Sequence, residues 1–255
     1  MSALQRSSLS PIAIASTAFA LIMASALIGM VLRTRLPEHH LSGDSKDVIK
    51  LATALVGTMA ALVLALLFAS TRTAFEHTSA AVSRMTADVV QLDQLLDEYG
   101  PQAKPIRAAL REEIGPLIDS IWREDAEARG AKAEPRSHNE TVLYMLRELA
   151  PGNPVQASAQ QRALQISTDL AQTRLALSAQ PTDTLSHPFI IVLVVWLMFI
   201  FAVFSMSSPP NATLGIVLFL CILSASAAIY LILELGQPFD GLMQISNEAL
   251  RTALR

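Results

Sequence analysis

Long apolar stretches alternate with polar ones along the chain, and four of them are long enough to cross a membrane. They cover about residues 11–32, 48–69, 188–206 and 212–235. A bilayer core of about 30 Å is crossed by a helix of roughly 20 apolar residues. The charges inside these stretches are Lys50 and Glu234, and each lies near one end of its stretch. The pattern predicts four transmembrane helices in two hairpins.

The first apolar stretch also has a second interpretation. Arg6 precedes it, and Ala24-Ser25-Ala26 resembles the small-x-small cleavage site of a signal peptide. The apolar run continues to Leu32, however, which makes it long enough to span a membrane. An uncleaved membrane anchor is therefore favoured over a cleaved signal peptide.

The section between the second and third spans is charged, and its apolar residues recur at helical spacing. Helices are predicted over 73–99, from about Ile106 to Trp122, after an Asn139 cap, and after the break at Pro151–Pro154, with a linker at 123–137. The alternation typical of a strand is absent, so no sheet is expected. The first and last of these helices join the neighbouring spans directly and are predicted to continue them.

These elements predict an all-α polytopic membrane protein with a helical extramembrane domain inserted between spans two and three. The expected divisions are a first hairpin (1–70), the helical domain (71–187), a second hairpin (188–240) and a C-terminal tail (241–255).

Composition agrees with a membrane protein and excludes some functions. Hydrophobic residues make up 52% of the 255 residues and charged residues 16%, against about 25% in soluble proteins. The net charge of −3 gives no basic face for nucleic acid. Cys221 is the only cysteine, which excludes an internal disulfide and a thiolate metal site.

The loop between the first two spans contains the densest polar motif, PEHHLSGDSKD, with His39, His40, Asp44 and Asp47. These side chains could bind a divalent cation. Alternatively, Ser42 or Asp44 caps the second span, and Asp47 lies in its first turn, where the helix dipole favours a carboxylate. Capping is favoured, and the four residues are not expected to hold a structural metal together.

A second polar motif, ELGQPFDG, follows the fourth span. Glu234 lies where a membrane helix meets water, and a carboxylate at that depth is a functional candidate. The alternative is structural pairing with Arg72 or Arg84. We expect Glu234 to contact a basic side chain or a helix terminus rather than lipid. Asp240 and Gly241 are predicted to form a turn.

The second span contains Thr53, Gly57 and Thr58, which are candidate pore-lining residues because hydroxyls without charge suit a weakly selective pore. Small residues at a spacing of about four allow close helix packing instead. Such stripes are Ser16/Ala20/Ala24, Ala54/Thr58/Ala61/Ala65/Ala69 and Ser224/Ala228. Periodicity does not separate the two interpretations. Catalytic signatures and phosphate-binding loops are absent, so neither an enzyme nor a cofactor is expected.

Three segments, 37–67, 92–111 and 209–246, resemble the bestrophin-like domain family of bacteria and plastids. The most specific parts are LPEHHLSGDSKD and ELGQPFDG, and the resemblance covers nearly the whole chain. It implies four spans and a distant kinship with bestrophins, which are pentameric anion channels. The chain departs from this pattern at Pro210, where many relatives have a basic residue, and in its second span, where Phe68 is the only aromatic residue.

Four spans place the N-terminus, the helical domain and the C-terminus on one face of the membrane, and the loops 33–47 and 207–211 on the other. Basic residues near the span ends are too evenly divided between the faces for the positive-inside rule to decide. The resemblance implies a cytoplasmic helical domain, hence a multi-pass protein of the inner membrane.

Two functions from different classes stay open. One is a homo-oligomeric ion channel embedded in membrane lipid, pentameric if it follows the bestrophins. The other is a scaffold or sensor that transports nothing and whose helical domain binds a partner protein. A weaker third hypothesis is a metal- or proton-linked transporter that uses His39, His40 and Glu234.

Overall fold

The computed structural model describes residues 10–35, 43–121, 139–179, 187–207, 211–239 and 245. These residues form seven α-helices and one short 3₁₀ turn, and no strand occurs among them. The elements are α1 (Pro11–Arg35), α2 (Gly43–Tyr99), η2 (Pro101–Ala103), α3 (Lys104–Ile121), α4 (Asn139–Glu148), α5 (Pro154–Ala179), α6 (His187–Ser207) and α7 (Ala212–Leu235). The predicted all-helical fold is confirmed.

Helices α1, α2, α6 and α7 are long and apolar enough to cross a membrane, at the four predicted places. Helix α2 has 57 residues, far more than a span needs, so the second span and the first helix of the extramembrane section form one uninterrupted helix, as predicted. The corresponding prediction for α5 and α6 depends on residues 180–186, which lie outside the described part of the chain. The predicted linker 123–137 also lies outside it.

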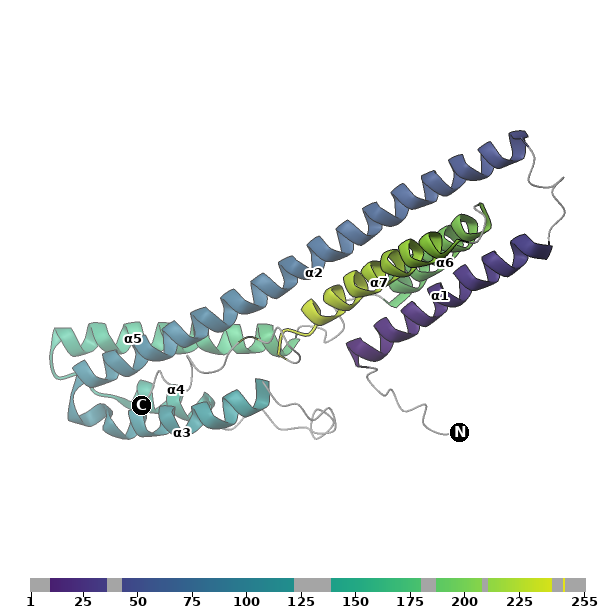
Figure 1. The fold of residues 1–255 in the computed structure, drawn as a ribbon. Coiled ribbons are helices and arrows are strands. Elements are labelled where there is room, and N and C mark those ends of the chain that lie inside the picture. Colours follow the sequence, from purple (N-terminus) through teal and green to yellow (C-terminus); the bar gives the residue numbers. More distant parts are fainter. Residues whose placement is uncertain are drawn as a thin grey trace, which may run out of the picture. The chain divides into compact units, whose positions relative to one another are not determined.

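The chain divides into two compact units. The membrane unit contains Met1–Ala74 and Asp183–Gly236, and the helical domain contains Phe75–Thr182 and Gln237–Arg255. Figure 1 shows α1, α6 and α7 side by side in the first unit, and α3, α4 and α5 with the C-terminal part of α2 in the second. Each unit has its own hydrophobic core.

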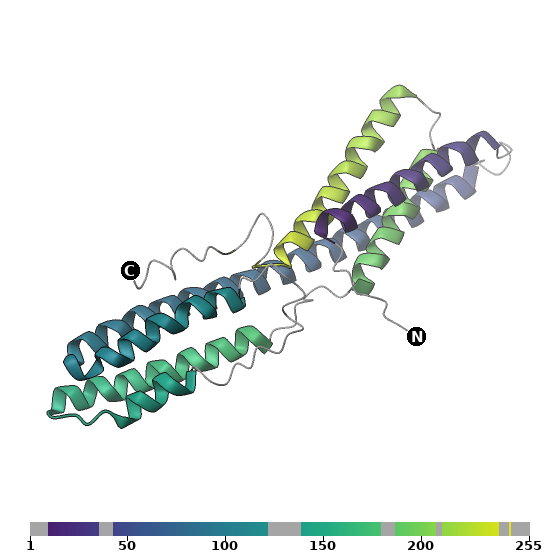
Figure 2. The same cartoon turned by 90° about the horizontal axis from the view of Figure 1, so that it is seen from below.

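In the membrane unit, α1 packs mainly against α6 and also against α7, whereas α6 and α7 diverge from each other (Figure 2). Ser25 Oγ donates a hydrogen bond to the Met198 carbonyl (3.0 Å), and Arg33 Nη1 donates one to the Met206 carbonyl (3.0 Å). Because both partner positions increase by eight residues, the two helices run parallel. Their N-terminal ends therefore lie on the same membrane face, as four spans require.

Helix α2 contributes one narrow row to the core of the membrane unit. Between residues 53 and 67, its buried or partly buried residues are Thr53, Val56, Gly57, Ala60, Val63, Leu64 and Leu67. Spacings of three and four alternate along most of this row, which is the pattern of a helix that packs through a single seam. The remaining faces of the span are exposed in one protomer.

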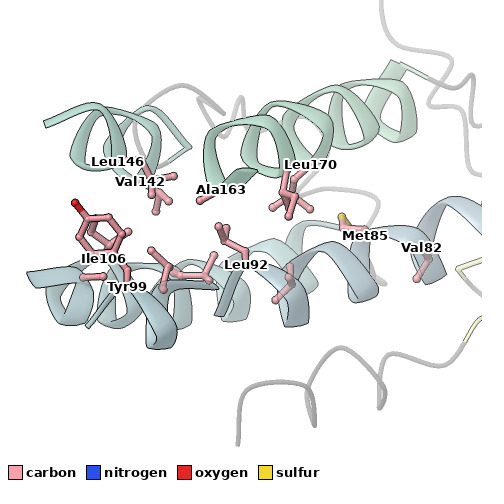
Figure 3. Close-up of a cluster of buried hydrophobic side chains, with 14 of the residues drawn as sticks. Val82, Met85, Leu92, Tyr99, Ile106, Val142, Leu146, Ala163 and Leu170 are labelled. Atoms are coloured by element: carbon pink, nitrogen blue, oxygen red, sulfur yellow. The ribbon is translucent and has the colours of Figure 1, made fainter. Parts of the chain in front are cut away.

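The helical domain is an antiparallel bundle with a core of the same kind. On α2, the buried residues are Val82, Met85, Val89, Leu92, Leu96 and Tyr99, and on α5 they include Ala163, Ile166, Leu170 and Leu177. Figure 3 shows these rows facing each other, with Val142 and Leu146 of α4 above Ile106 and Tyr99. Burial of this apolar surface is the main force that holds the domain together.

The hairpin between α2 and α3 is held by a turn and by an ion-pair cluster. Gly100 has φ 108°, a conformation that glycine adopts without strain, and Pro101 begins the next turn. The Arg107 guanidinium binds both carboxylate oxygens of Asp93, at 2.9 and 2.7 Å, and also binds Asp97. These bonds hold the pKa of the Asp93 carboxyl below its usual value.

Two glutamines on α5 bind the free carbonyls at the ends of other helices. Gln156 Nε2 donates to the Tyr99 carbonyl, and Gln160 Nε2 donates to the carbonyls of Leu146 and Leu149, at 2.8–2.9 Å. The last carbonyls of a helix have no partner within the helix, so these bonds fix the register of α5 against α2 and α4.

The chain after α7 contributes to the helical domain. Phe239 and Ile245 are partly buried against its core, and the Ile245 amide donates to the Pro238 carbonyl (2.9 Å). The start of the segment that was predicted as a tail therefore packs on the domain at Ile245.

Candidate functional site

The candidate residues before the second span are only partly described. His39 and His40 lie outside the described residues, and the side chain of Asp44 is not described. Helix α2 begins at Gly43, so Asp44 and Asp47 both lie in its first turns, where carboxylates interact favourably with the helix dipole. Asp47 is exposed, and its Oδ1 lies 3.7 Å from Lys50 Nζ. The expectation that these four residues do not hold a structural metal together is untested and stays a prediction.

The three candidate pore-lining residues do not share one face of α2. Thr53 is only 2% exposed and faces the core of the membrane unit, and its hydroxyl donates to the Ile49 carbonyl at 2.8 Å. Thr58 lies on the opposite, exposed side, and its hydroxyl donates to the Leu55 carbonyl at 2.8 Å. Gly57 lies between them, with open space where a Cβ would be. Within one protomer, Thr58 is the candidate that is free to line a path.

The small-residue stripes found in the sequence lie mainly on the outside of the protomer. Ser16, Ala20, Ala24, Ala54, Thr58, Ala61, Ala65, Ala69 and Ser224 are all exposed, and Ala228 is partly buried. The helix contact inside the protomer uses a different row on α1, formed by Ser25, Gly29 and Arg33 at a spacing of four. This row was not among the stripes predicted from the sequence, although its residues recur at the same spacing of four.

Glu234 is withdrawn from the outer surface of α7. It is 4% exposed, and its neighbours Ile232, Leu233 and Leu235 are also buried, so the last turn of the helix is enclosed. The Tyr230 phenol, one turn earlier, interacts with the Glu234 carboxylate. This polar neighbour is a phenol, and the expected contact of Glu234 with a basic side chain or a helix terminus stays a prediction. Asp240 and Gly241, which were predicted to form a turn, lie outside the described residues.

A model of the bestrophin-like domain matches residues 20–250 of the chain. The chain belongs to the bestrophin-like domain family. No curated protein and no solved structure matches it.

In this bestrophin-like chain, the match covers all described residues of the helical domain and the whole of the second, third and fourth spans. It covers α1 from residue 20 onward. It therefore contains the α1–α6 contact, the exposed face of the α2 span and the enclosed end of α7. This bestrophin-like protein is a helical membrane protein, and its candidate site is the α2 span. The described residues there offer hydroxyls and small apolar side chains, which can line a path or pack against a helix.

Proposed function

We propose that the protein forms a homo-oligomer whose α2 spans surround an axial ion path. The observation that carries this proposal is the low coverage of α2. Of the most apolar part of this span, 11% is buried in the protomer, against 33% in each of the other three spans. The α2 helix thus has the largest surface available for contact with other copies.

The chemistry of this surface supports the proposal. The exposed row of α2 contains Ala54, Thr58, Ala61 and Ala65, and the side chains between them are apolar. Small side chains let helices approach closely in lipid, where apolar residues gain nothing by leaving the acyl chains. A ring of Thr58 hydroxyls would offer oxygen atoms to a passing ion, and the apolar residues beside it would form a constriction.

Family kinship extends the proposal to the ion, the stoichiometry and the orientation. Bestrophins are pentameric anion channels, so we propose an anion path through a pentamer. Arg33 and Arg35 at the end of α1 would place positive charge at one mouth of this path. By the same kinship we propose that the helical domain and both termini lie in the cytoplasm and that the spans lie in the inner membrane.

Cysteine accessibility tests this arrangement, because Cys221 is the only native cysteine and lies exposed on α7. The protein is placed in liposomes as a Cys221→Ser background, with Thr58→Cys or with Thr53→Cys as a buried control on the same helix. We expect a charged, membrane-impermeant methanethiosulfonate to modify Thr58→Cys and to block anion flux. We expect wild-type Cys221, which is exposed on α7, to face lipid and therefore not to react.

Two results together would contradict a channel. If Thr58→Cys is inert and wild-type liposomes pass no ion under any gradient, the α2 surface faces lipid or a closed helix contact. The second candidate function then becomes the better one, namely a membrane scaffold or sensor that transports nothing. The feature that favours this alternative is the helical domain, which has a complete core of its own and could bind a partner protein.

A further inference from the structure

Helices α2 and α5 form an antiparallel seam in the helical domain, and one hydrogen bond fixes its register. Gln156 near the start of α5 donates to the carbonyl of Tyr99 at the end of α2. Leu92 lies seven residues before Tyr99 on α2, and Ala163 lies seven residues after Gln156 on α5. Figure 3 shows these two side chains opposite each other. Residues at equal distances from the Gln156–Tyr99 bond therefore lie at the same level of the seam.

At one level the apolar seam is interrupted by polar groups. Asp88 lies eleven residues before Tyr99 on α2, and Ser167 lies eleven residues after Gln156 on α5. Ser167 is 6% exposed, and among the described residues its hydroxyl oxygen has no hydrogen-bond partner. Asp88 is partly buried, next to core residue Val89. A buried hydroxyl without a partner weakens the packing of this layer.

A second carboxylate destabilises this layer further. Asp169 follows Ser167 by two residues on α5, and its charge acts on Asp88. Burial first, and then repulsion by Asp169, raises the pKa of the Asp88 carboxyl, although Arg162 of α5 and Arg84 of α2 act in the opposite direction. Like charges at neighbouring positions of a helix seam destabilise it.

We propose that the layer of Asp88, Ser167 and Asp169 is the point at which the helical domain opens, and that it closes when Asp88 takes up a proton. Protonation removes the repulsion and turns the Asp88 carboxyl into a group that can donate a hydrogen bond. The seam therefore tightens as the pH falls through the folded-state pKa of Asp88, which lies above the ordinary value of 3.8. The Arg107–Asp93 cluster, five residues further along α2, has the opposite dependence because it needs an ionised carboxylate.

The proposed pH-dependent layer includes a residue of α2, and α2 also forms the second span because it is continuous from Gly43 to Tyr99. Its existence does not depend on ion conduction. It is a pH-dependent change in the opening of one layer of the domain, which a channel or a scaffold could use equally.

Hydrogen exchange on the full-length protein in detergent micelles tests the proposal. Protection factors, corrected for the intrinsic pH dependence of exchange, are compared for the amides around Asp88 and Ser167. In the wild type we expect protection to increase by about twofold as the pH falls from neutral through the folded-state pKa of Asp88, the effect of one relieved like-charge pair. Asp88→Asn should have this higher protection already at neutral pH, with no further change on acidification.

Asp169→Asn provides an independent test, because this exposed side chain can be replaced without disturbing the core. It should reproduce part of the increase at neutral pH. Asp93→Asn is the matched control on α2 and should lower protection at neutral pH. If both Asp88→Asn and Asp169→Asn lower the protection of this layer, the aspartates stabilise the seam and the proposal is wrong. It is also wrong if wild-type protection does not change with pH.

Discussion

The backbone of Gly29 in α1 lies directly against the carbonyl oxygen of Ala202 in α6. A Cβ atom at position 29 would lie closer to that oxygen than real Cβ contacts come. Ser25 and Arg33, one turn before and one turn after Gly29, both donate hydrogen bonds to carbonyls of α6. Close backbone approach and interhelical hydrogen bonds are the forces that hold membrane helices together in lipid.

Gly29→Ala should therefore destabilise the membrane unit, because the added methyl group can be accommodated only if α1 and α6 move apart. The expected loss is about 1–3 kcal/mol, the usual cost of overpacking. Thermal unfolding of the detergent-solubilised protein measures it. Gly57→Ala is the matched control, since nothing lies within 4 Å of its Cβ position. That variant should be neutral or slightly more stable, because alanine favours a helix. Equal stabilities of the two variants would contradict the close contact.

The Arg107–Asp93 pair should make a pH-dependent contribution to the helical domain. Arg107 holds the folded-state pKa of Asp93 below the ordinary value of 3.8. A carboxyl with a lowered pKa stabilises the fold above its unfolded-state pKa, and this stabilisation is lost as the pH falls through the folded-state value. Asp93→Asn should cost about 1–3 kcal/mol at neutral pH, as for other hydrogen bonds to charged groups.

The difference between wild type and Asp93→Asn should then disappear in strong acid. Denaturant unfolding at a series of pH values, followed through the α2–α3 hairpin, measures this difference. Asp47→Asn is a suitable control because the Asp47–Lys50 pair is exposed, and exposed pairs contribute little. A loss that is the same at all pH values would show that shape rather than charge makes Asp93 important.

The helical domain was more predictable from the sequence than the packing of the spans, for a physical reason. In water, apolar residues leave the surface, so the spacing of Val82, Met85, Val89 and Leu92 identified a face that is buried in the structure. Lipid accepts apolar side chains on every face, so the spans have apolar residues both inside and outside. The spans were located by the length of the apolar stretches alone.

Only the structure shows which side of each span packs inward. On α1, the exposed stripe that includes Ala20 and the packed row that includes Gly29 both contain small residues, and only the structure shows which of the two packs inward. The continuity of α2 was predictable because no proline or glycine interrupts it between Gly57 and Gly100. The partial burial of Asp88 at the seam was not, because it depends on the register between two helices far apart in sequence.

The exposed row of α2 makes the last prediction, which concerns assembly. If the α2 spans of neighbouring copies pack through Ala61 and its small neighbours, a large side chain at that position will keep the helices apart. Ala61→Trp should then weaken association by roughly five- to hundredfold, the equivalent of about 1–3 kcal/mol of overpacking. The mass of the detergent-solubilised particle, measured by light scattering over a dilution series, reports this change. Leu220→Trp on the exposed surface of α7 is the matched control and should assemble like the wild type. Should Ala61→Trp assemble as well as this control, the outer face of α2 contacts lipid, and the axial arrangement of α2 must be abandoned even if the protein is oligomeric.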